Sequence, residues 1–292
     1  MQAFDYVAAQ TVNEAVSLLA EKGDRARVLA GGTDLIVQIR EGRRDLDLIV
    51  DVKKVPDVNV MTYNPQSGLQ LGAAVPFYRI YGDATIAQAY PGLMDAFSLV
   101  GGIQIQGRAS AGGNLCNSSP AADTTPALIV HQAVCIIAGP NGQREVAVED
   151  FCTAPGQNVL AQGEFLVSFR IPAPPAHFGA QYQRFIPRNE MDIAVVGTAS
   201  AVILSDDLST ITAARVALGA VAPTPIVVPE ASAALIGKPI SDQAIQAAAE
   251  AAKAAARPIS DMRGTIEQRK HLAGVLTQRT LQVAIARAKG EA

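Results

Sequence analysis

The sequence predicts an α+β fold in which a two-part N-terminal region is followed by a small C-terminal α/β domain. Three observations support this prediction. The chain has 292 residues, more than one small core requires, which indicates two or three packed modules. Short apolar runs of strand character alternate with helical segments. The segment Pro172–Pro175 (Pro-Ala-Pro-Pro) marks a boundary, so the expected modules span residues 1–60, 61–174 and 175–292.

The composition is that of a globular protein, with 49% hydrophobic and 17% charged residues. The formal net charge is −3, and no basic stripe with interleaved aromatic side chains is present, which argues against a nucleic-acid or anionic-membrane partner. No segment approaches the roughly 20 apolar residues that a membrane span needs. Met1–Gln10 lacks the charged and apolar regions of a secretory signal. We therefore expect a cytoplasmic protein.

The three cysteines are Cys116, Cys135 and Cys152. They are spaced too widely for the motif of a zinc site or an iron–sulfur cluster. An odd number of widely spaced cysteines indicates reduced thiols. The sequence therefore predicts no metal site on this chain.

A capping box opens the first predicted helix, with Thr11 at the N-cap and Glu14 three residues later. The helix is expected to end near Lys22, because Gly23 suits the position after the last turn. Two short apolar strands separated by a charged turn should complete this module: Val28–Ala30, Leu48–Val50 and the turn Arg40–Arg44.

The second module is predicted to contain strands, a broken helix and a long loop. Strand character is expected in Leu69–Ala73, Ala133–Ala138 and Phe165–Ile171. Residues 83–99 are expected to be helical, with an interruption at Pro91. The segment 101–126 is rich in Gly, Ser, Asn and Pro, and a loop of that length is expected to have a functional role.

The C-terminal domain is predicted to hold two strands and two helices. These are the strands Ala194–Leu204 and Ile211–Val221, a helix capped by Ser241 that ends near Arg257-Pro258, and a long helix from about Thr265 to Lys289. Asp206-Asp207 lies in the turn between the strands. The last helix should bury one apolar face, which includes Leu272, Val275, Leu276 and Val283.

Two glycine-rich segments are the strongest candidates for ligand binding. Loop 1 is Ala30-Gly31-Gly32-Thr33-Asp34-Leu35, and loop 2 is Ser110-Ala111-Gly112-Gly113-Asn114. Consecutive glycines let the backbone approach a ligand and turn several N–H groups toward phosphate oxygens, so two such loops are able to clasp a pyrophosphate. Neither loop matches a Rossmann or Walker motif, and each loop taken alone is more typical of an ordinary tight turn.

Two carboxylates accompany the loops: Asp34 within loop 1, and Asp123 at the end of the segment 118–123. A pyrophosphate repels a carboxylate, so we expect neither side chain to touch phosphate. We expect them to accept hydrogen bonds from ribose or ribityl hydroxyls, or from loop N–H groups. The alternative is that each carboxylate only stabilises its own loop as an Asx turn.

The chain offers little acid–base machinery of its own. His131, His177 and His271 are far apart in the sequence and are more typical of surface or packing residues, and no nucleophile elbow is present. Arg184 and Arg188 form either a solvated charged edge or a surface that faces an anionic ligand. Ligand-binding loops without catalytic side chains indicate that a bound cofactor carries the chemistry.

Together the two loops resemble a known pair of signatures. Residues 29–35 and 110–114, with Ser119-Pro120 and Asp123, are similar to the two FAD motifs of the medium subunits of molybdenum hydroxylases. That family includes carbon monoxide dehydrogenase, nicotine dehydrogenase, bacterial xanthine dehydrogenase and 4-hydroxybenzoyl-CoA reductase. The resemblance covers almost the whole chain, and Arg263–Arg279 resembles the family's C-terminal helix signature. It implies a vanillyl-alcohol-oxidase (PCMH) type of FAD-binding domain in two α+β halves.

The resemblance also implies which residues hold FAD, with both loops on the pyrophosphate and Asp123 at the ribityl chain. Leu166 corresponds to a strand position that meets the isoalloxazine edge, and Arg184 to a basic residue near the flavin. Val100 stands where some relatives place an aromatic ring. The implied cofactor-binding residues are Leu29, Ala30, Gly31, Gly32, Thr33, Asp34, Leu35, Val100, Ser110, Ala111, Gly112, Gly113, Asn114, Asp123, Leu166 and Arg184; no catalytic residue and no metal ligand is implied.

The function that the resemblance implies is electron transfer within a molybdenum-containing hydroxylase. A large subunit hydroxylates the substrate at a molybdenum–pterin centre, and electrons pass through 2Fe-2S clusters on a small subunit to the FAD of this chain and then to an external acceptor. The assembly is expected to be a dimer of heterotrimers. Two alternatives remain open at this point: a non-enzymatic nucleotide- or anion-binding scaffold subunit, and a stand-alone FAD oxidase of the same fold.

Overall fold

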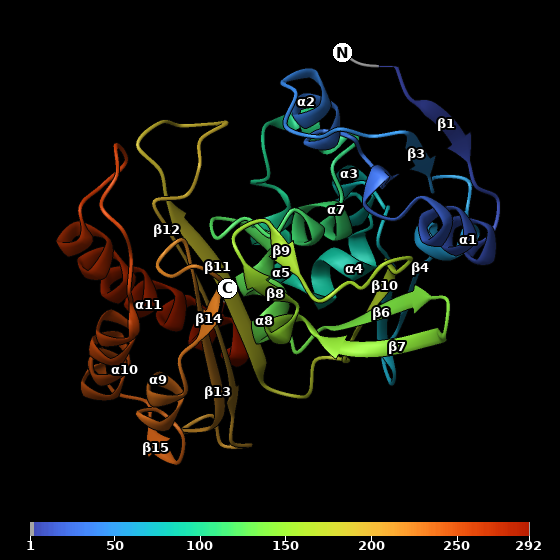
Figure 1. Cartoon of the computed structure of the whole chain (residues 1–292). Helices are drawn as coiled ribbons and strands as arrows, with labels where there is room; N and C mark the ends of the chain where they lie inside the picture. The colour runs from blue at the N-terminus through green and yellow to red at the C-terminus, as the bar shows by residue number, and fades with distance from the viewer. Residues whose placement is uncertain (1–2, 292) are drawn as a thin grey trace.

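The computed structural model describes residues 3–291, so Met1, Gln2 and Ala292 of the predicted modules lie outside the described residues. Figure 1 shows the C-terminal strands and helices, coloured gold to red, on one side of the molecule and the blue-to-green elements on the other. The mixture of sheets and helices confirms the predicted α+β class.

The first part of the chain forms a three-stranded parallel sheet with the order β1-β3-β2. Its elements are β1 (Asp5–Ala8), α1 (Val12–Lys22), a 3-10 turn (Gly23–Arg25), β2 (Ala26–Leu29), α2 (Leu35–Arg40) and β3 (Leu48–Asp51). The predicted cap is confirmed, because Thr11 accepts a hydrogen bond from the N–H of Glu14 and Gly23, with a φ of 53°, ends α1. The Glu14 carboxylate, however, accepts from the N–H of Gln10. Helix α2 was not predicted, because its six residues are too few to show a helical period.

The middle of the chain forms a five-stranded antiparallel sheet with the order β4-β5-β10-β6-β7. The strands are β4 (Met61–Asn64), β5 (Gly68–Gly72), β6 (Val134–Gly139), β7 (Gly142–Ala147) and β10 (Phe165–Ile171), with β8 (Cys152–Ala154) and β9 (Gln157–Asn158) paired separately. The helices are α3 (Phe77–Tyr81), α4 (Ala84–Ala89), α5 (Pro91–Phe97), α6 (Ile103–Gln106), α7 (Ala111–Cys116) and α8 (Thr124–Val130), and 3-10 turns occur at Pro56–Asn59 and Val148–Asp150. The predicted strands and the helix break at Pro91 are confirmed.

The predicted loop 101–126 is wrong in part, because α6, α7 and the start of α8 lie within it. Gly, Ser and Asn have low helix propensity, but tertiary packing overrides that preference here. Ser110 caps α7 by accepting a hydrogen bond from the N–H of Gly113, and Ala111 and Leu115 are buried in the core. Loop 2 is therefore the first turn of a short helix.

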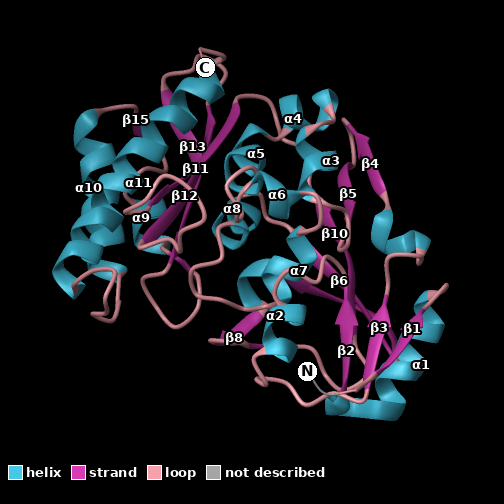
Figure 2. Cartoon of the chain, turned by 90° about the horizontal axis from the view of Figure 1, so that it is seen from above, coloured by secondary structure: helices cyan, strands magenta, loops and turns pink. Residues whose placement is uncertain are grey.

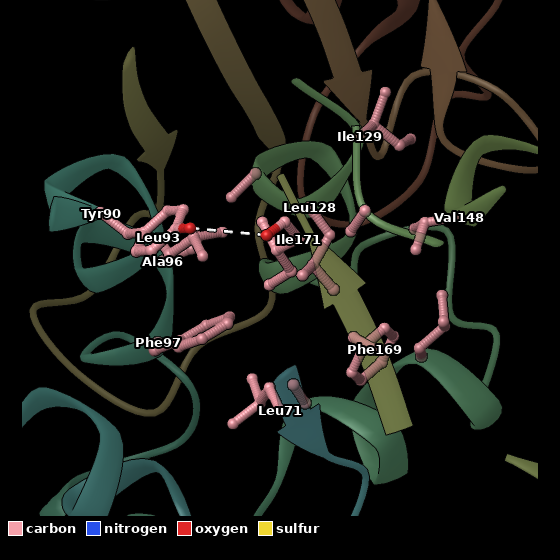
Figure 3. Packing of buried hydrophobic residues seen from close by; sticks show 14 of the residues in the cluster. Leu71, Tyr90, Leu93, Ala96, Phe97, Leu128, Ile129, Val148, Phe169 and Ile171 are labelled. Carbon is pink, nitrogen blue, oxygen red and sulfur yellow. Dashed lines mark hydrogen bonds between the residues drawn. The ribbon is translucent and has the colours of Figure 1, made fainter. Parts of the chain in front are cut away.

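Figure 3 shows the core on which these helices rest. Side chains of the five-stranded sheet pack with side chains of α5 and α8 in one buried cluster, which includes Leu71, Phe169, Ile171, Leu93, Phe97 and Leu128. The Tyr90 hydroxyl donates to the carbonyl oxygens of Pro172, at 3.0 Å, and Ile171, at 3.4 Å. This core fixes the platform from which loop 2 projects.

The C-terminal sheet has helices on both faces. Its elements are β11 (Phe178–Phe185), β12 (Val196–Leu204), β13 (Thr210–Gly219), β14 (Ile226–Val227), α9 (Pro229–Ala233), β15 (Lys238–Pro239), α10 (Asp242–Ala255) and α11 (Ile266–Lys289). Figures 1 and 2 show α9, α10 and α11 on the outer face of the sheet, and α5 and α8 contact its strands from the other side. Strand β11, which the sequence analysis missed, pairs with β12 along its whole length and carries Arg184.

The predicted buried face of α11 needs correction. Leu276 is buried, but Leu272, Val275 and Val283 are only partly buried. Small residues dominate the face that packs on the sheet: Ala273, Thr277, Thr280, Ala284 and Ala288 are all buried. The helix approaches β11 so closely that a Cβ on Gly179 would overlap with the carbonyl oxygen of Ala284, and only small side chains fit that separation.

His131 is a packing residue, as predicted. It is buried between α8 and β11, where its ring lies against those of Tyr90 and Phe178. Its Nδ1 lies 2.8 Å from the carbonyl oxygen of Ala127, so the neutral ring carries its proton there, and burial lowers the pKa of His131 to about 4. His177 is partly buried and His271 is exposed.

We expect His131 to make the protein less stable in mild acid. The unfolded histidine takes up a proton near pH 6.5, whereas the folded one stays neutral until about pH 4, so the free energy of unfolding falls as the pH drops through this window. The maximal effect is about 3 kcal/mol. Urea unfolding at several pH values should show a shallower pH dependence for His131→Phe than for the wild type. Equal slopes in the two proteins would assign the acid sensitivity to other groups.

Candidate functional site

A cavity of about 670 Å³ lies between the first and second parts of the chain. Loop 1 lines it from one part and loop 2 from the other, and further parts of the wall come from the segment 156–163 and the start of β10. Small-molecule and cofactor sites typically have volumes of ~300–1,000 Å³. The cavity therefore joins the two glycine-rich segments that the sequence analysis singled out.

Loop 1 connects β2 to α2, and all six of its residues line the cavity. Gly32 has a φ of +79°, a conformation that other residues rarely adopt. A Cβ on Gly31 would overlap with the carbonyl oxygen of Arg108, so loop 1 lies directly against the backbone that precedes loop 2. Leu29 is buried in the strand before the loop and does not line the cavity.

The two glycines of loop 2 have different surroundings. A Cβ on Gly112 would lie 2.5 Å from the Ala73 side chain, so this glycine permits close packing within the protein. A Cβ on Gly113 would meet only the Ser110 hydroxyl, at 3.3 Å, and would otherwise occupy open space. Gly113 has no left-handed φ, so backbone conformation is not the reason for a glycine at this position. Its lack of a side chain instead leaves room in the cavity.

The other loop 2 residues are placed around this opening. Ser110 and Asn114 line the cavity, whereas Ala111 is buried behind it. The Thr124 hydroxyl donates to Asn114 Oδ1 at 2.6 Å and so links α7 to α8. These contacts anchor loop 2 to α8 and to the core.

Asp34, Val100 and Leu166, three of the residues expected to bind the cofactor, also line the cavity, and their contact with FAD stays a prediction. Burial raises the pKa of Asp34, and its side chain does not cap α2. Leu166 lies where β10 has a register shift in its pairing with β6. Cys116 lines the same cavity, and burial raises the pKa of its thiol to about 12, so it is a neutral thiol and no activated nucleophile.

Asp123 and Arg184 are brought together, but away from the cavity wall. The Asp123 carboxylate accepts a hydrogen bond from the Tyr182 hydroxyl at 2.7 Å and forms an ion pair with Arg184 at 2.6 Å. Burial raises the pKa of Asp123, and Arg184 and Tyr182 offset part of that rise. Arg184 instead borders a second, shallow hollow that includes Leu99 and Arg188. The ribityl contact expected of Asp123 stays a prediction.

Several polar residues of the cavity were missed by the sequence analysis. The cavity wall also contains Asp24, Arg27, Gln38, Arg44, Asn117, Gln157, Asn158, Gln162 and Glu164. Apart from Glu164, which adjoins the strand that carries Leu166, these residues belong to no motif, and tertiary packing brings them together from four separate segments. The only local signal was the positive charge of Arg27 and Arg44 on either side of loop 1.

Residues 3–291 contain neither a membrane-spanning helix nor a cluster of metal-binding side chains. No helix in that range is both long and apolar enough to cross a membrane. No group of three or more His, Cys, Asp or Glu side chains in the same range is arranged to hold a metal ion.

Two known family models match the chain, one over its N-terminal and one over its C-terminal region. Residues 2–174 match a model described as the FAD binding domain in molybdopterin dehydrogenase. Residues 181–284 match the CO dehydrogenase flavoprotein C-terminal domain. The first match ends at residue 174, within the proline-rich segment, and the second begins at residue 181.

Individual proteins are similar in sequence to this chain over almost its whole length. The chain is 32% identical to a xanthine dehydrogenase FAD-binding subunit of Escherichia coli O157:H7, covering 98% of this chain and 97% of that one. It is 30% identical to the carbon monoxide dehydrogenase medium chain of Hydrogenophaga pseudoflava, covering 97% and 98%.

Solved structures show the same architecture. A carbon monoxide dehydrogenase structure from Hydrogenophaga pseudoflava superimposes with a TM-score of 0.93 at 31% identity, covering 98% of both chains. Quinoline 2-oxidoreductase from Pseudomonas putida 86 superimposes with a TM-score of 0.89 at 29% identity, covering 99% of this chain and 98% of that one.

Proposed function

This chain belongs to the family of FAD-binding subunits of molybdenum hydroxylases, and we propose that it holds FAD in the cavity between loops 1 and 2 as the electron-transfer subunit of such an enzyme. When bound, FAD supplies the redox chemistry by which electrons from 2Fe-2S clusters on a partner subunit reach an external acceptor. The molybdenum–pterin centre and the clusters belong to the partner subunits.

The observation that carries this proposal is the opening at Gly113. A Cβ there would project into the space that both glycine loops enclose, which is the cradle that a close-lying ligand requires. Backbone N–H groups of the two loops are suited to pyrophosphate oxygens. The cavity residues therefore fit an extended dinucleotide.

Each side chain of the site has a proposed task. Loops 1 and 2 bind the pyrophosphate, Asp34 accepts hydrogen bonds from sugar hydroxyls, and Val100 and Leu166 flank the flavin end. Leu29 and Ala111 support the loops from behind. Asp123 and Arg184, whose ion pair connects the segment after loop 2 to β11, are proposed to support the ribityl and flavin region.

We propose the division into modules 1–60, 61–174 and 175–292 as a division of tasks. The first two modules each contribute one loop to the cavity. The third packs α11 against β11 and forms the Arg287–Asp95 ion pair with α5, at 2.6 Å. It therefore holds the second module in place.

We also propose the partners and the location. The relatives are described as subunits or medium chains, which supports an assembly with a large molybdenum subunit and a small 2Fe-2S subunit, as a dimer of heterotrimers. A cytoplasmic location is supported by the three unpaired cysteines.

The experiment that tests the proposal is cofactor analysis of the purified full chain. We expect a flavin absorbance spectrum, about one FAD per chain by extraction, and neither iron nor molybdenum by metal analysis. A colourless protein that does not take up added FAD would support a scaffold subunit instead. Substrate turnover by the chain alone would support the stand-alone oxidase.

A further inference from the structure

Two arginines line the cavity on either side of loop 1. Arg27 lies in β2 and Arg44 follows α2. Burial lowers the pKa of Arg27, and the nearby guanidinium of Arg44 lowers it further. The two positive charges therefore lie close enough to repel each other at the wall of one cavity.

Neutral acceptors hold both side chains in place. Arg27 Nη1 donates to the carbonyl oxygens of Ala26, at 2.7 Å, and Asp24, at 3.0 Å. Arg44 Nε donates to Gln38 Oε1 at 3.2 Å, and Gln38 donates in turn to Asn117 at 3.1 Å. These bonds fix the orientation of the guanidinium groups. Because the acceptors are neutral, they do not compensate the positive charges.

Carboxylates compensate little of the positive charge of Arg27 and Arg44. The Asp24 side chain is fully exposed, and its Oδ1 lies 3.9 Å from Arg27 Nη2. Arg44 forms no ion pair with any carboxylate in residues 3–291. Charges that repel each other and lack a close counter-ion raise the free energy of the protein, and an anion placed between them relieves that repulsion.

Two arginines near the pair but outside the cavity, Arg43 and Arg25, have close counter-ions. Arg43, directly beside Arg44 in the sequence, contacts Glu41 at 2.8 Å. Arg25 contacts Asp45 at 2.8 Å and Asp47 at 2.6 Å. Neither arginine lines the cavity. Of these four arginines, the two without a close counter-ion are the two that line the cavity.

We propose that Arg27 and Arg44 bind phosphate oxygens of the dinucleotide, as a cationic element in addition to the N–H groups of loops 1 and 2. This inference rests on the proposed function, because it concerns the same cavity. Guanidinium groups form strong, charge-assisted hydrogen bonds with phosphate. The pair makes the site selective for phosphate-bearing ligands, FAD and ADP, over riboflavin.

The test is a set of binding titrations on the full chain after FAD removal, with FAD, ADP and riboflavin as ligands. We expect Arg27→Gln and Arg44→Gln each to weaken FAD and ADP about tenfold or more, and to leave the riboflavin affinity unchanged. Arg43→Gln, the matched control, should bind all three like the wild type. Arg44→Lys should recover part of the loss, because it keeps the charge.

The salt dependence provides a second measurement. Removing one phosphate contact should flatten the decline of FAD affinity with rising salt concentration in Arg27→Gln and Arg44→Gln, but not in Arg43→Gln. FAD and ADP affinities equal to those of Arg43→Gln would overturn the inference, as would a riboflavin loss equal to the FAD loss. Failure of the wild-type chain to bind FAD would instead overturn the proposed function.

Discussion

Gly113→Val is expected to weaken FAD binding on the order of 100-fold, so that the purified variant is nearly colourless. The Cβ of the new side chain enters open space that belongs to the cavity, and outside its own helix backbone it meets only the Ser110 hydroxyl. The new Cβ therefore displaces no buried protein group, while the ligand loses the room it needs. Flavin content after purification and the FAD dissociation constant from fluorescence titration measure the effect.

Gly107→Val is the matched control for this variant. Gly107 lies just before loop 2, has nothing within 4 Å of an added Cβ and has no left-handed φ. It does not line the cavity, so this variant should keep its flavin. Gly112→Val should differ from both, since its clash with Ala73 lowers the stability of the protein itself. Stoichiometric flavin in Gly113→Val would show that loop 2 does not hold the cofactor.

The second large effect is expected in the assembled enzyme. With Gly113→Val in this subunit, steady turnover with the physiological acceptor should fall on the order of 100-fold, because the chain no longer retains the cofactor that serves the acceptor. A single reduction of the partner's iron–sulfur clusters by substrate should persist, since the proposed function places hydroxylation on other subunits. Bleaching of the cluster absorbance after mixing with substrate measures this half-reaction.

Two controls make that result interpretable. Subunit composition and metal content of the variant complex must match those of the wild type, and an artificial dye that accepts electrons from the clusters should restore part of the turnover. If cluster reduction is lost as well in an intact complex, the chain takes part in the hydroxylation step. Its role as an electron-transfer subunit would then be wrong.

The local elements could be predicted because their causes are local. Helix α1 begins after Thr11 and ends before Gly23 because of contacts within a few residues. The apolar run Phe165–Ile171 coincides with β10. Loops 1 and 2 were recognisable because consecutive glycines are needed wherever backbone comes close to another group. For the same reason, the resemblance to a known family rested on these segments.

The role of each glycine in loops 1 and 2 depends on its tertiary contacts. Gly31 and Gly112 allow the protein to pack on itself, whereas Gly113 leaves space for a ligand. The three look alike in the sequence, since each belongs to a Gly-Gly pair. They differ only in what the rest of the chain places opposite them.

The sequence by itself determined the α+β class, the short elements with clear caps and the two loops, because propensity, capping and glycine geometry act over a few residues. Only the tertiary structure decided which charged side chains form ion pairs and which line the cavity. Asp123 lies beside loop 2 in the sequence, but it is held by Arg184, about sixty positions away, at 2.6 Å. Arg27 and Arg44 are ordinary surface residues by sequence, and they share one cavity wall because the chain folds back through α2. Burial and charge pairing depend on distant neighbours, which no local pattern records.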